Sequence, residues 1–588
     1  MQELLTSLRE RASRDPQETA AFFVSGSTEF DISNRSYAEL DQHSRRIASW
    51  LQERFSPGDR ALLAYSPGLE FVTAFFGCVY AGLIAVPAPV PARSGHQHRR
   101  LAAIARDAGV RVVLTQEEDR RTLEKWSAEA GLPGLLVHTT DTTGAGDGDP
   151  SAWREPAVTP DATALLQYTS GSTGDPKGVM VSHRNLTLNG ERIAGALGLD
   201  SRARYGGWMP LYHDMGLIGV MLPGILLGRG YVQLDSLSFL RNPFQWLRMM
   251  DELDVSMTAS PDFGYDICVR RVTDEQLATL DLSRLRAAVN GSEPVRSLTL
   301  DRFQERFGPA GFRAEAMVPM YGLAEATLMA SGTGGRVPPR TPVGVPALER
   351  GLLAPAGEGE EARTLTGCGT DSGSEAVIVD PDTHEVLPEG RIGEIWLSGP
   401  CVAQGYWQSE AATTAAFRAR TADGAGPHLR TGDLGGWLDG DLYVTGRRKD
   451  VLVVHGRNLY PHDIEDELRD RHEELDGLLG AVFMVGGADG IDTDPVVVVV
   501  QETRRQPDSE ALAPLAATLK QFVAREFGVP VGAVALVRPR SVRRTTSGKI
   551  QRAAMRELYV TGRLGPVLLS EDPLLTAALA GLRQEEAR

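Results

Sequence analysis

Short apolar runs alternate with amphipathic helical stretches up to about residue 440 of this 588-residue chain. Residues 60–65 form an apolar run of strand length, and residues 69–83 follow it with a helical pattern. The same order recurs at residues 110–114 and 119–131. Strands that alternate with helices build parallel sheets with helices on their faces. The pattern therefore predicts an α/β fold for most of the chain.

The C-terminal part has a different pattern, which is typical of a small α+β unit. After residue 450 the sequence predicts a strand, a polar turn and a helix that begins at Pro461 with acidic residues in its first turns. A strand at 496–500, a helix near 512–527 and a strand at 534–537 complete the unit. We expect three parts, namely a large N-terminal domain over residues 1–445, a hinge at 446–450 and a small C-terminal domain over 451–588.

One segment between the two patterns has no regular periodicity. About 45 residues between 330 and 375, rich in Gly, Pro, Arg and Glu, separate a predicted helix from the next predicted strand. Loops of this length in a compact fold are usually functional or mobile. A disordered insertion without a role is the alternative.

Length and charge limit the class of protein. The chain is too long for one hydrophobic core, which agrees with two or more domains. Its formal net charge of −16 argues against general nucleic-acid binding, because phosphate backbones attract basic surfaces. An acidic surface favours a basic protein partner, although solubility alone explains it as well.

Cysteine usage and hydropathy indicate the compartment. The four cysteines are scattered without any Cys-x-x-Cys spacing, so neither a zinc knuckle nor a disulfide framework is indicated. The N-terminus is charged throughout and lacks the apolar core of a signal peptide. The longest apolar stretches, at 217–227 and 496–500, are too short or too interrupted to cross a bilayer. We therefore expect a cytoplasmic protein without membrane insertion.

Lysine is rare in this chain, and its positions are informative. Only five of the 61 basic residues are lysines, and Lys177, Lys449 and Lys549 each fall in a short motif. Positions that keep lysine in an arginine-rich chain indicate a need for a compact ammonium group, which suits phosphate oxygens. Chance is the alternative, because the sample is small and Lys125 and Lys520 have the character of ordinary surface residues.

The strongest single motif is YTSGSTGDPKG at residues 168–178, which directly follows the apolar run 164–166. Its glycines let backbone N–H groups approach anionic oxygens, its hydroxyl residues add donors, and Lys177 adds charge. The spacing differs from that of a Walker P-loop. A flexible linker is the alternative, but Pro176 and Lys177 disfavour it. The loop therefore predicts a polyphosphate site.

Five motifs in order resemble those of the adenylate-forming superfamily, which includes acyl-CoA synthetases, nonribosomal-peptide adenylation domains and luciferases. They are the loop at 168–178, YGLAE at 321–325, TGD at 431–433, GRRKD at 446–450 and SGK at 547–549. The resemblance covers nearly the whole chain. It implies a large N-terminal domain of helix-flanked sheets with a β-barrel-like part, and a small mobile C-terminal α+β domain.

The resemblance also implies a role for each motif in binding ATP and Mg²⁺. Asp433 would accept hydrogen bonds from both ribose hydroxyls, Glu325 would hold Mg²⁺, and Arg447 would reach ribose or phosphate. Tyr321 and the backbone of 290–294 would flank adenine. The alternatives are a helix or turn cap for Asp433, an exposed helix-cap glutamate for Glu325, plain packing for Tyr321 and a surface charge for Arg447. The residues expected to bind ATP are Thr169, Ser170, Gly171, Ser172, Thr173, Gly174, Lys177, Asn290, Gly291, Ser292, Glu293, Pro294, Tyr321, Gly322, Leu323, Ala324, Asp433, Arg447 and Lys549.

Lys549 is expected to carry the first reaction, with Glu325 and Lys177 as the other catalytic residues. When a carboxylate attacks the α-phosphorus of ATP, negative charge accumulates on the nonbridging oxygens. An ammonium group placed there stabilises the transition state more than the ground state. Lys449 is the expected pivot of the hinge, about which the small domain would present different faces in two steps.

Several details resemble one branch of the superfamily, the fatty acyl-AMP ligases. Ala324 stands where many members have a threonine that contacts the α-phosphate, and YGLAE is typical of this branch. The segments 210–219, 290–294 and 456–461 point the same way. The segment at about 335–370 lies where this branch carries an insertion, which is thought to restrain the small domain and disfavour CoA.

A fatty chain needs a long apolar cavity. By resemblance, His213 would lie between the nucleotide and the acyl pocket, although a lone histidine is as often structural. Spacing alone predicts that the nearby apolar residues are core residues. The residues that could line an acyl tunnel are Trp208, Met209, Met215, Phe263 and Met320.

The resemblance implies a two-step ligase for lipid, polyketide or lipopeptide biosynthesis. A fatty acid and ATP would give an acyl-adenylate and pyrophosphate, and the acyl group would pass to the phosphopantetheine thiol of an acyl carrier protein. A fatty acyl-CoA synthetase is the nearest alternative. An inactive nucleotide-binding partner of a synthase is a remote one, because Lys177, Glu325, Asp433 and Lys549 are all present.

Overall fold

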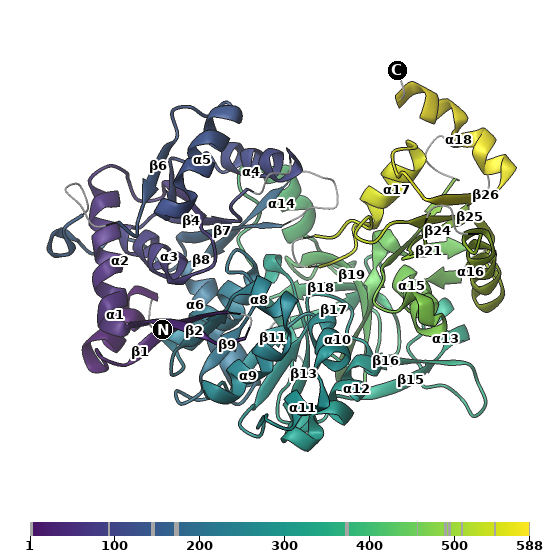
Figure 1. Ribbon diagram of the computed structural model, residues 1–588, viewed down its shortest axis with the longest axis horizontal. Helices are drawn as coiled ribbons and strands as arrows, with labels where there is room; N and C mark the ends of the chain where they lie inside the picture. Colours follow the sequence, from purple (N-terminus) through teal and green to yellow (C-terminus); the bar gives the residue numbers. More distant parts are fainter. Residues whose placement is uncertain are drawn as a thin grey trace.

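A computed structural model shows two sheet-containing lobes and a smaller C-terminal part (Figure 1). The structure describes residues 4–26, 28–91, 95–142, 148–169, 176–370, 375–454, 457–486, 491, 495–506, 510–545 and 548–586. Mixed sheets flanked by helices precede a small α+β unit, so the fold class predicted from the sequence is confirmed. Nothing in the described part of the chain is a helix long and apolar enough to span a bilayer.

The largest sheet has eight strands in the described residues, in the order β14-β13-β12-β11-β9-β10-β1-β2. Its inner strands pair in parallel, whereas the edge strands β14 and β2 pair antiparallel to their neighbours. The strands are β1 (Thr19–Ser25), β2 (Asp31–Ser36), β9 (Tyr205–Gly207), β10 (Tyr231–Leu234), β11 (Met257–Ser260), β12 (Ala287–Asn290), β13 (Met317–Gly322) and β14 (Met329–Gly332). The carboxyl ends of β11, β12 and β13 therefore lie at one edge.

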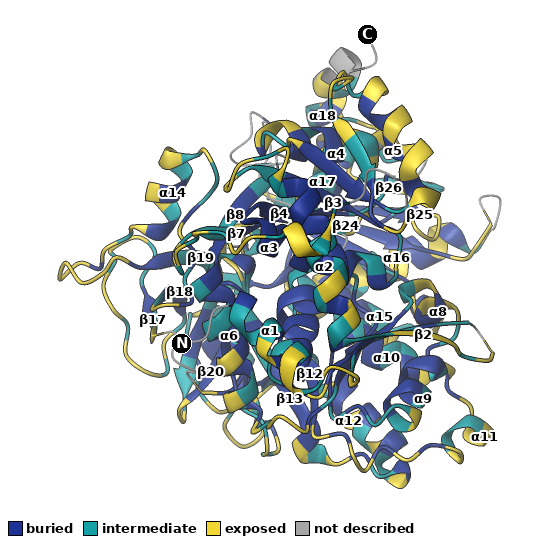
Figure 2. Cartoon of the chain, turned by 90° about the vertical axis from the view of Figure 1, so that its left-hand side faces the viewer, coloured by how far each residue is buried: buried dark blue, intermediate teal, exposed yellow. Residues whose placement is uncertain are grey.

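A second sheet has the order β6-β5-β3-β4-β7-β8 and is parallel except for the β7–β8 pair. Its strands are β3 (Arg60–Ala64), β4 (Ile84–Ala88), β5 (Val112–Thr115), β6 (Leu136–Thr139), β7 (Thr163–Thr169) and β8 (Lys177–Ser182). The strands and helices expected from the first apolar runs appear here as β3, α3, β5 and α5. The strands of both sheets are mostly buried (Figure 2).

Helices cover these two sheets. The α-helices up to residue 417 are α1 (Leu4–Arg14), α2 (Tyr37–Gln52), α3 (Leu69–Ala81), α4 (Gly95–Asp107), α5 (Glu117–Glu129), α6 (His183–Ala196), α7 (Leu222–Leu226), α8 (Ser236–Arg241), α9 (Phe244–Glu252), α10 (Asp262–Arg271), α11 (Asp274–Leu277), α12 (Ser297–Phe307), α13 (Val345–Glu349) and α14 (Glu410–Phe417). A π-helix, η2 (Met215–Met221), precedes α7. Short 3-10 turns are η1 (Pro150–Ala152), η3 (Gly308–Ala310), η4 (Ala314–Ala316), η5 (Ala324–Ala326), η6 (Arg448–Asp450) and η7 (Glu473–Leu475).

Helices α2 and α3 show how local sequence sets an element. The Ser36 hydroxyl accepts from the Glu39 backbone N–H at 3.3 Å, and the Glu39 carboxylate accepts from the Ser36 N–H at 2.8 Å. This reciprocal cap is worth about 1 kcal/mol and fixes the start of α2. A Cβ at Gly77 of α3 would lie 2.7 Å from Cγ2 of Ile47 in α2, so glycine permits the close contact of the two helices.

The described part of the segment between residues 330 and 375, which was predicted as a long loop, contains a helix and two strands, so that prediction was wrong. It follows strand β14, not a helix, and it contains β15 (Arg340–Gly344), α13 and β16 (Ala362–Thr366), with β15 and β16 paired antiparallel. Val343, Leu348 and Leu353 pack in a small core with Tyr443, a residue far away in the sequence. Local patterning could not show this partner.

The hairpin lies beside a four-stranded antiparallel sheet of order β17-β18-β19-β20, in the region where the β-barrel-like part was expected. The strands are β17 (Glu375–Val379), β18 (Gly393–Ser398), β19 (Leu429–Leu438) and β20 (Asp441–Arg447). Strand β20 ends at the segment expected to be a hinge, so this sheet leads directly into the C-terminal part.

The C-terminal part begins with the hairpin of β21 (Leu452–Val454) and β22 (Arg457–Leu459). A sheet of order β23-β24-β25-β26 follows, with helices α15 to α18. The elements are α15 (Pro461–Arg471), β23 (Gly480–Val485), β24 (Val496–Glu502), α16 (Leu512–Phe527), β25 (Val531–Val537), α17 (Arg552–Val560), β26 (Leu568–Glu571) and α18 (Pro573–Glu586). The hydrophobic clusters of the described residues lie either before residue 445 or after residue 451. The domain bounds remain a prediction.

Candidate active site

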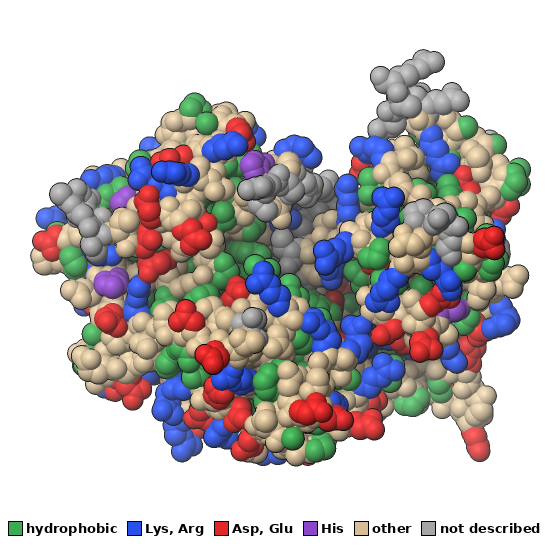
Figure 3. Space-filling view, viewed as in Figure 1, with side chains coloured by type: hydrophobic (Ala, Val, Ile, Leu, Met, Phe, Trp, Pro, Cys, Tyr) green, Lys and Arg blue, Asp and Glu red, His purple; other side chains and the backbone are tan. Residues whose placement is uncertain are grey.

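The described parts of the segments expected to bind ATP meet between the two lobes and the C-terminal part, where Tyr321 and Arg447 contact Asp433. A space-filling view shows a hollow there, with Lys and Arg side chains around its rim (Figure 3). Thr169 ends β7 and pairs with Lys177, which begins β8. The expected nucleotide residues Ser170, Gly171, Ser172, Thr173 and Gly174 fall outside the described residues.

Asp433 is held by two partners at the end of the β19–β20 pair. Tyr321 donates its hydroxyl hydrogen to Oδ2 of Asp433 at 2.9 Å, and Nε of Arg447 lies 3.1 Å from Oδ1. Asp433 and Arg447 are opposite each other in the strand register, and Asp433 is 7% exposed. Burial, then the charge of Asp433, raises the pKa of Tyr321, so the phenol remains a donor. Each carboxylate oxygen keeps a lone pair for a ribose hydroxyl.

Glu325 lies in η5, and a residue that the sequence analysis missed orients it. The Tyr406 hydroxyl donates to Oε1 of Glu325 at 2.8 Å. The Lys177 ammonium lies 5.1 Å from the centre of the Tyr406 ring. Tyr406 reaches this place because it forms an antiparallel bridge with Val179 of β8. One carboxylate, one lysine and one tyrosine thus lie together, a set that could hold a metal and a phosphate.

The side chains of Glu325, Tyr406 and Lys177 are suited to a site that holds Mg²⁺ together with phosphate oxygens. No group of three or more His, Cys, Asp or Glu side chains that could hold a metal alone occurs in the described residues. Mg²⁺ in nucleotide sites is usually held by one or two carboxylates together with substrate phosphates. The partly exposed carboxylate of Glu325, fixed by Tyr406 and facing the Lys177 strand, suits that arrangement.

Lys549 of the C-terminal part reaches the large domain. Burial lowers the pKa of Lys549, and the charge of Arg447 lowers it further, whereas Asp433, Asp214 and Glu293 oppose the shift. All four of these charged neighbours precede residue 450 in the chain, so they lie outside the C-terminal part. A Cβ at Gly548 would lie 3.1 Å from the Phe263 ring, so the lysine loop packs on that ring. The amine is therefore enclosed by the nucleotide-side residues.

Buried hydrogen bonds hold the segment at 290–294 in place. The Asn290 side chain is fully buried and donates from Nδ2 to Oδ1 of Asp262 at 2.9 Å. Burial raises the pKa of Asp262 to about 6. Oε1 of Glu293 accepts the Phe263 backbone N–H at 2.8 Å, and burial, reinforced by Asp262, raises the pKa of Glu293 to about 7. The sequence analysis missed Asp262, which begins α10.

Close backbone approach explains the glycines around this segment. A Cβ at Gly291 would lie 2.7 Å from the Met320 carbonyl oxygen, and one at Gly322 would lie 1.9 Å from that of Leu328. Ser292 adopts a positive φ of 68° within the turn that leads to Pro294. Leu323 donates its N–H to Leu328, and Ala324 is buried at the start of η5.

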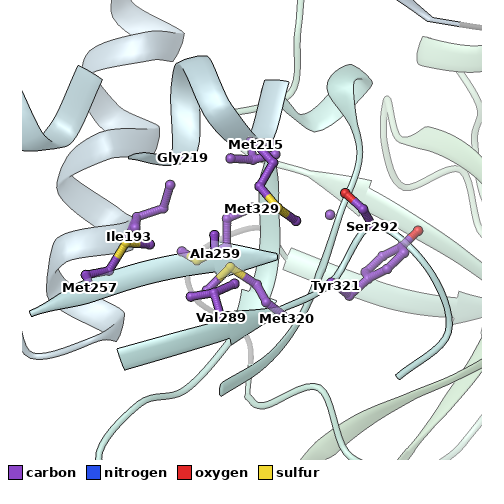
Figure 4. A pocket seen from close by; sticks show the side chains of 13 residues that line it. Ile193, Met215, Gly219, Met257, Ala259, Val289, Ser292, Met320, Tyr321 and Met329 are labelled. Atoms are coloured by element: carbon purple, nitrogen blue, oxygen red, sulfur yellow. The ribbon is translucent and has the colours of Figure 1, made fainter. Parts of the chain in front are cut away.

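A narrow pocket runs from this segment into the large sheet (Figure 4). Ser292 and Tyr321 lie at one end, and Ile193 and Met257 lie at the other. The lining is mostly apolar and consists of Ile193, Met215, Gly219, Met257, Ala259, Val289, Gly291, Ser292, Met320, Tyr321, Gly322, Leu328 and Met329. Part of its wall is the π-helix η2, a widened helical form that is frequent at functional sites.

Two of the residues expected around the acyl chain, Met215 and Met320, line this pocket. The others do not. The ring of Trp208 stacks on that of Phe239, with 4.1 Å between ring centres, and meets the Phe263 ring edge to face at 5.6 Å. Met209, the next residue after Trp208, is buried. Nδ1 of His213 lies 2.8 Å from Oδ1 of Asp214.

Neither His213 nor Asp214 lines the pocket, and Asp214 lies within electrostatic reach of Lys549. Burial alone would raise the pKa of Asp214, but His213 and Lys549 lower it. The pocket residues that were not anticipated, such as Met257, Val289 and Met329, have the ordinary spacing of core residues. No sequence signal marks them.

Lys449 lies in η6, next to the site. Burial lowers the pKa of Lys449, and the charges of Arg447 and, more weakly, Lys177 act in the same direction. The expected pivot of the hinge is therefore close to the phosphate end of the site.

The chain is similar to known proteins over most of its length. A family model described as AMP-binding enzyme matches residues 8–407. A medium-chain-fatty-acid acyl-carrier-protein ligase of Moorena producens is 37% identical over 548 residues, which are 91% of this chain and 91% of that protein. A fatty acyl-adenylate ligase of L. pneumophila, solved in complex with acyl adenylate and pyrophosphate, is 32% identical with a TM-score of 0.73 and covers 98% of each chain. A structure from work on fatty acyl-adenylate ligases of E. coli and L. pneumophila has a TM-score of 0.83 and 29% identity, over 95% of this chain and 98% of that one.

Proposed function

We propose, from the membership of this chain in the AMP-binding enzyme family and its fatty acyl-AMP ligase branch, that it activates a fatty acid as an acyl-adenylate. It then transfers the acyl group to a carrier protein. ATP and a fatty acid give an acyl-adenylate and pyrophosphate. The acyl group then passes to the phosphopantetheine thiol of an acyl carrier protein. The related ligase of Moorena producens is named for this acceptor, which supports the second step.

One observation supports the proposal best. The apolar pocket and the nucleotide-side residues share Ser292, Tyr321 and Gly322, and the hydroxyl of Tyr321 holds Asp433. A fatty chain in the pocket would therefore have its carboxylate beside the nucleotide, within the group of charges that surrounds Lys549. Pockets with apolar walls and a few polar groups at one end suit such amphipathic ligands.

In the first step a carboxylate oxygen attacks the α-phosphorus, and the bond from that phosphorus to the bridging oxygen breaks. Pyrophosphate leaves with the bonding electron pair. Lys549 stabilises the charge on the nonbridging oxygens, and Asp433 keeps the ribose, and thus the phosphorus, in place. Glu325 with Tyr406 would hold Mg²⁺, which when bound neutralises charge on the phosphates.

In the second step the carrier thiol sulfur attacks the acyl carbonyl carbon, the bond to AMP breaks, and the thiol proton passes to solvent. The proposed turn of the small domain about the hinge would take Lys549 away from the site in this step. The two steps need different surfaces at one site, and the hinge at Lys449 would allow the small domain to present them in turn. The joint presence of Lys177, Glu325, Asp433 and Lys549 in one site argues against an inactive binding partner.

The test supplies ATP, Mg²⁺, fatty acids from short to long chain, and either a holo carrier protein or CoA, with mass spectrometry of the products. We expect an acyl-adenylate and a thioester on the carrier, and no thioester on a carrier that lacks phosphopantetheine. A thioester on CoA alone would overturn the choice of acceptor. Absence of acyl-adenylate from every acid would overturn the proposal itself.

A further inference from the structure

Arg296 joins the nucleotide-side segment to the rest of the large domain through its backbone. Its N–H donates to Oδ1 of Asp262 at 3.2 Å, which is the same oxygen that accepts Nδ2 of Asn290 at 2.9 Å. The Thr299 hydroxyl donates to Oδ2 of Asp262 at 2.7 Å. Asp262 is 3% exposed, and a buried carboxyl with several partners is held rigidly. The main chain at Arg296 is therefore fixed relative to Asn290.

The side chain of Arg296 crosses to the C-terminal part. Its Nε lies 3.1 Å from Oδ2 of Asp466, and its Nη2 donates to Oδ2 of Asp470. Asp466 and Asp470 are four residues apart in α15, so they lie on one face of that helix. The Arg296 side chain is only 16% exposed. A single exposed ion pair contributes little to stability. A largely buried guanidinium that bridges two carboxylates has a fixed geometry, so it fixes the position of α15 relative to the large domain.

Helix α15 is in turn tied to the catalytic lysine. Glu465, next to Asp466, is 5% exposed and accepts two hydrogen bonds from Arg552, from Nε at 2.8 Å and from Nη2 at 2.5 Å. Arg552 begins α17, three residues after Lys549, and its Nη1 lies 3.4 Å from Oδ2 of Asp450 in η6. A continuous set of charged contacts therefore leads from Arg296 through α15 to the residues around Lys549.

We propose that Arg296 is a positioning residue for adenylation, which holds α15 in the orientation that places Lys549 at the α-phosphate. This inference rests on the proposed function. Arg296 acts through Asp466 and Asp470 and touches no reacting atom. The proposed turn of the small domain would take Lys549 away from the site in the acyl-transfer step, so the contact serves the first step alone.

Three variants break the contact from either side: Arg296→Gln, the double variant Asp466→Asn/Asp470→Asn, and their combination. We expect the adenylation kcat to fall by about 10- to 100-fold in each, because small misplacements of a catalytic group have effects of this size. The combination is expected to be no worse than either part, because all three remove one shared contact. Transfer from purified acyl-adenylate to a holo carrier protein is expected to stay within about twofold of the parent rate.

A matched control lies at the same domain border. Nη1 of Arg270 lies 3.7 Å from Oδ1 of Asp476, and the two side chains are 33% and 65% exposed. Asp476→Asn removes this pair, leaves the Arg270–Asp266 pair in place, and is expected to leave both steps unchanged. Thermal unfolding of each variant checks the fold, and the aspartate variants test the same contact if Arg296→Gln does not fold.

Equal loss in both steps, or losses that multiply in the combined variant, would overturn the inference. So would an unchanged adenylation rate in a folded Arg296→Gln. A parent protein that forms no acyl-adenylate overturns the proposed function and this inference with it, whereas an active parent with unaffected variants overturns the inference alone.

Discussion

Replacing Tyr406 by phenylalanine removes one hydroxyl and keeps the ring. The hydroxyl donates to Oε1 of Glu325 at 2.8 Å, and the ring centre lies 5.1 Å from the Lys177 ammonium. Burial, and next the charge of Glu325, raises the pKa of Tyr406, so the hydroxyl stays protonated and remains a donor. The substitution therefore removes a single hydrogen bond to the expected metal ligand and leaves the charges of Glu325 and Lys177 in place.

The size of the effect follows from that contact. A hydrogen bond to a charged group contributes about 1.5–3 kcal/mol. At about 1.4 kcal/mol per factor of ten this corresponds to roughly 10- to 100-fold in affinity, the same range found for residues that orient metal ligands. We expect the Mg²⁺ concentration for half-maximal adenylation to rise by about that factor. The KM for the fatty acid is expected to stay unchanged, because Tyr406 does not line the apolar pocket.

The assay is pyrophosphate release at fixed ATP and saturating fatty acid, with Mg²⁺ varied. Tyr443→Phe is a matched control, because the Tyr443 hydroxyl hydrogen-bonds to Thr341 at 2.7 Å in the small core around Val343. The reasoning is refuted if Tyr406→Phe leaves the Mg²⁺ dependence unchanged, or if Tyr443→Phe shifts it equally.

Four further predictions concern Lys549, the pH dependence of adenylation, Lys449 and the apolar pocket. Lys549→Ala is expected to slow adenylation by about 10²–10³-fold while transfer from purified acyl-adenylate persists; unchanged pyrophosphate exchange would remove Lys549 from its role. Because the ammonium is the active form, kcat/KM for adenylation is expected to fall as pH rises through the Lys549 pKa, which burial and Arg447 place below the ordinary value of about 10.4; a pH profile of Lys549→Ala without this decline is the check. Lys449→Pro is expected to impair transfer more than adenylation, and rate measurements that show equal losses would contradict a hinge. Met257→Trp, at the far end of the pocket, is expected to shift the preferred acid to shorter chains in a competition among mixed fatty acids followed by mass spectrometry, and an unchanged product profile would contradict that use of the pocket.

The sequence alone determined the elements whose signals are local. The helix predicted near 512–527 is α16, and the strand predicted at 496–500 lies within β24, because apolar periodicity and short apolar runs reflect the burial of neighbouring residues. Motif order along the chain also indicated the fold class and the family, both of which are confirmed. The segment between 330 and 375 shows the limit, because its hairpin is stabilised by Tyr443, about a hundred residues away.

The tertiary structure decided which residues meet. Tyr406 reaches Glu325 through a bridge to Val179, and Asp262 reaches Asn290 because β11 and β12 are paired. Met257 and Trp208 are both buried and apolar, yet only Met257 lines the pocket, since empty space depends on how side chains from several strands fit together. Local sequence sets the direction and burial of each side chain along its own element, whereas the distance between side chains on different elements depends on packing that no single segment encodes.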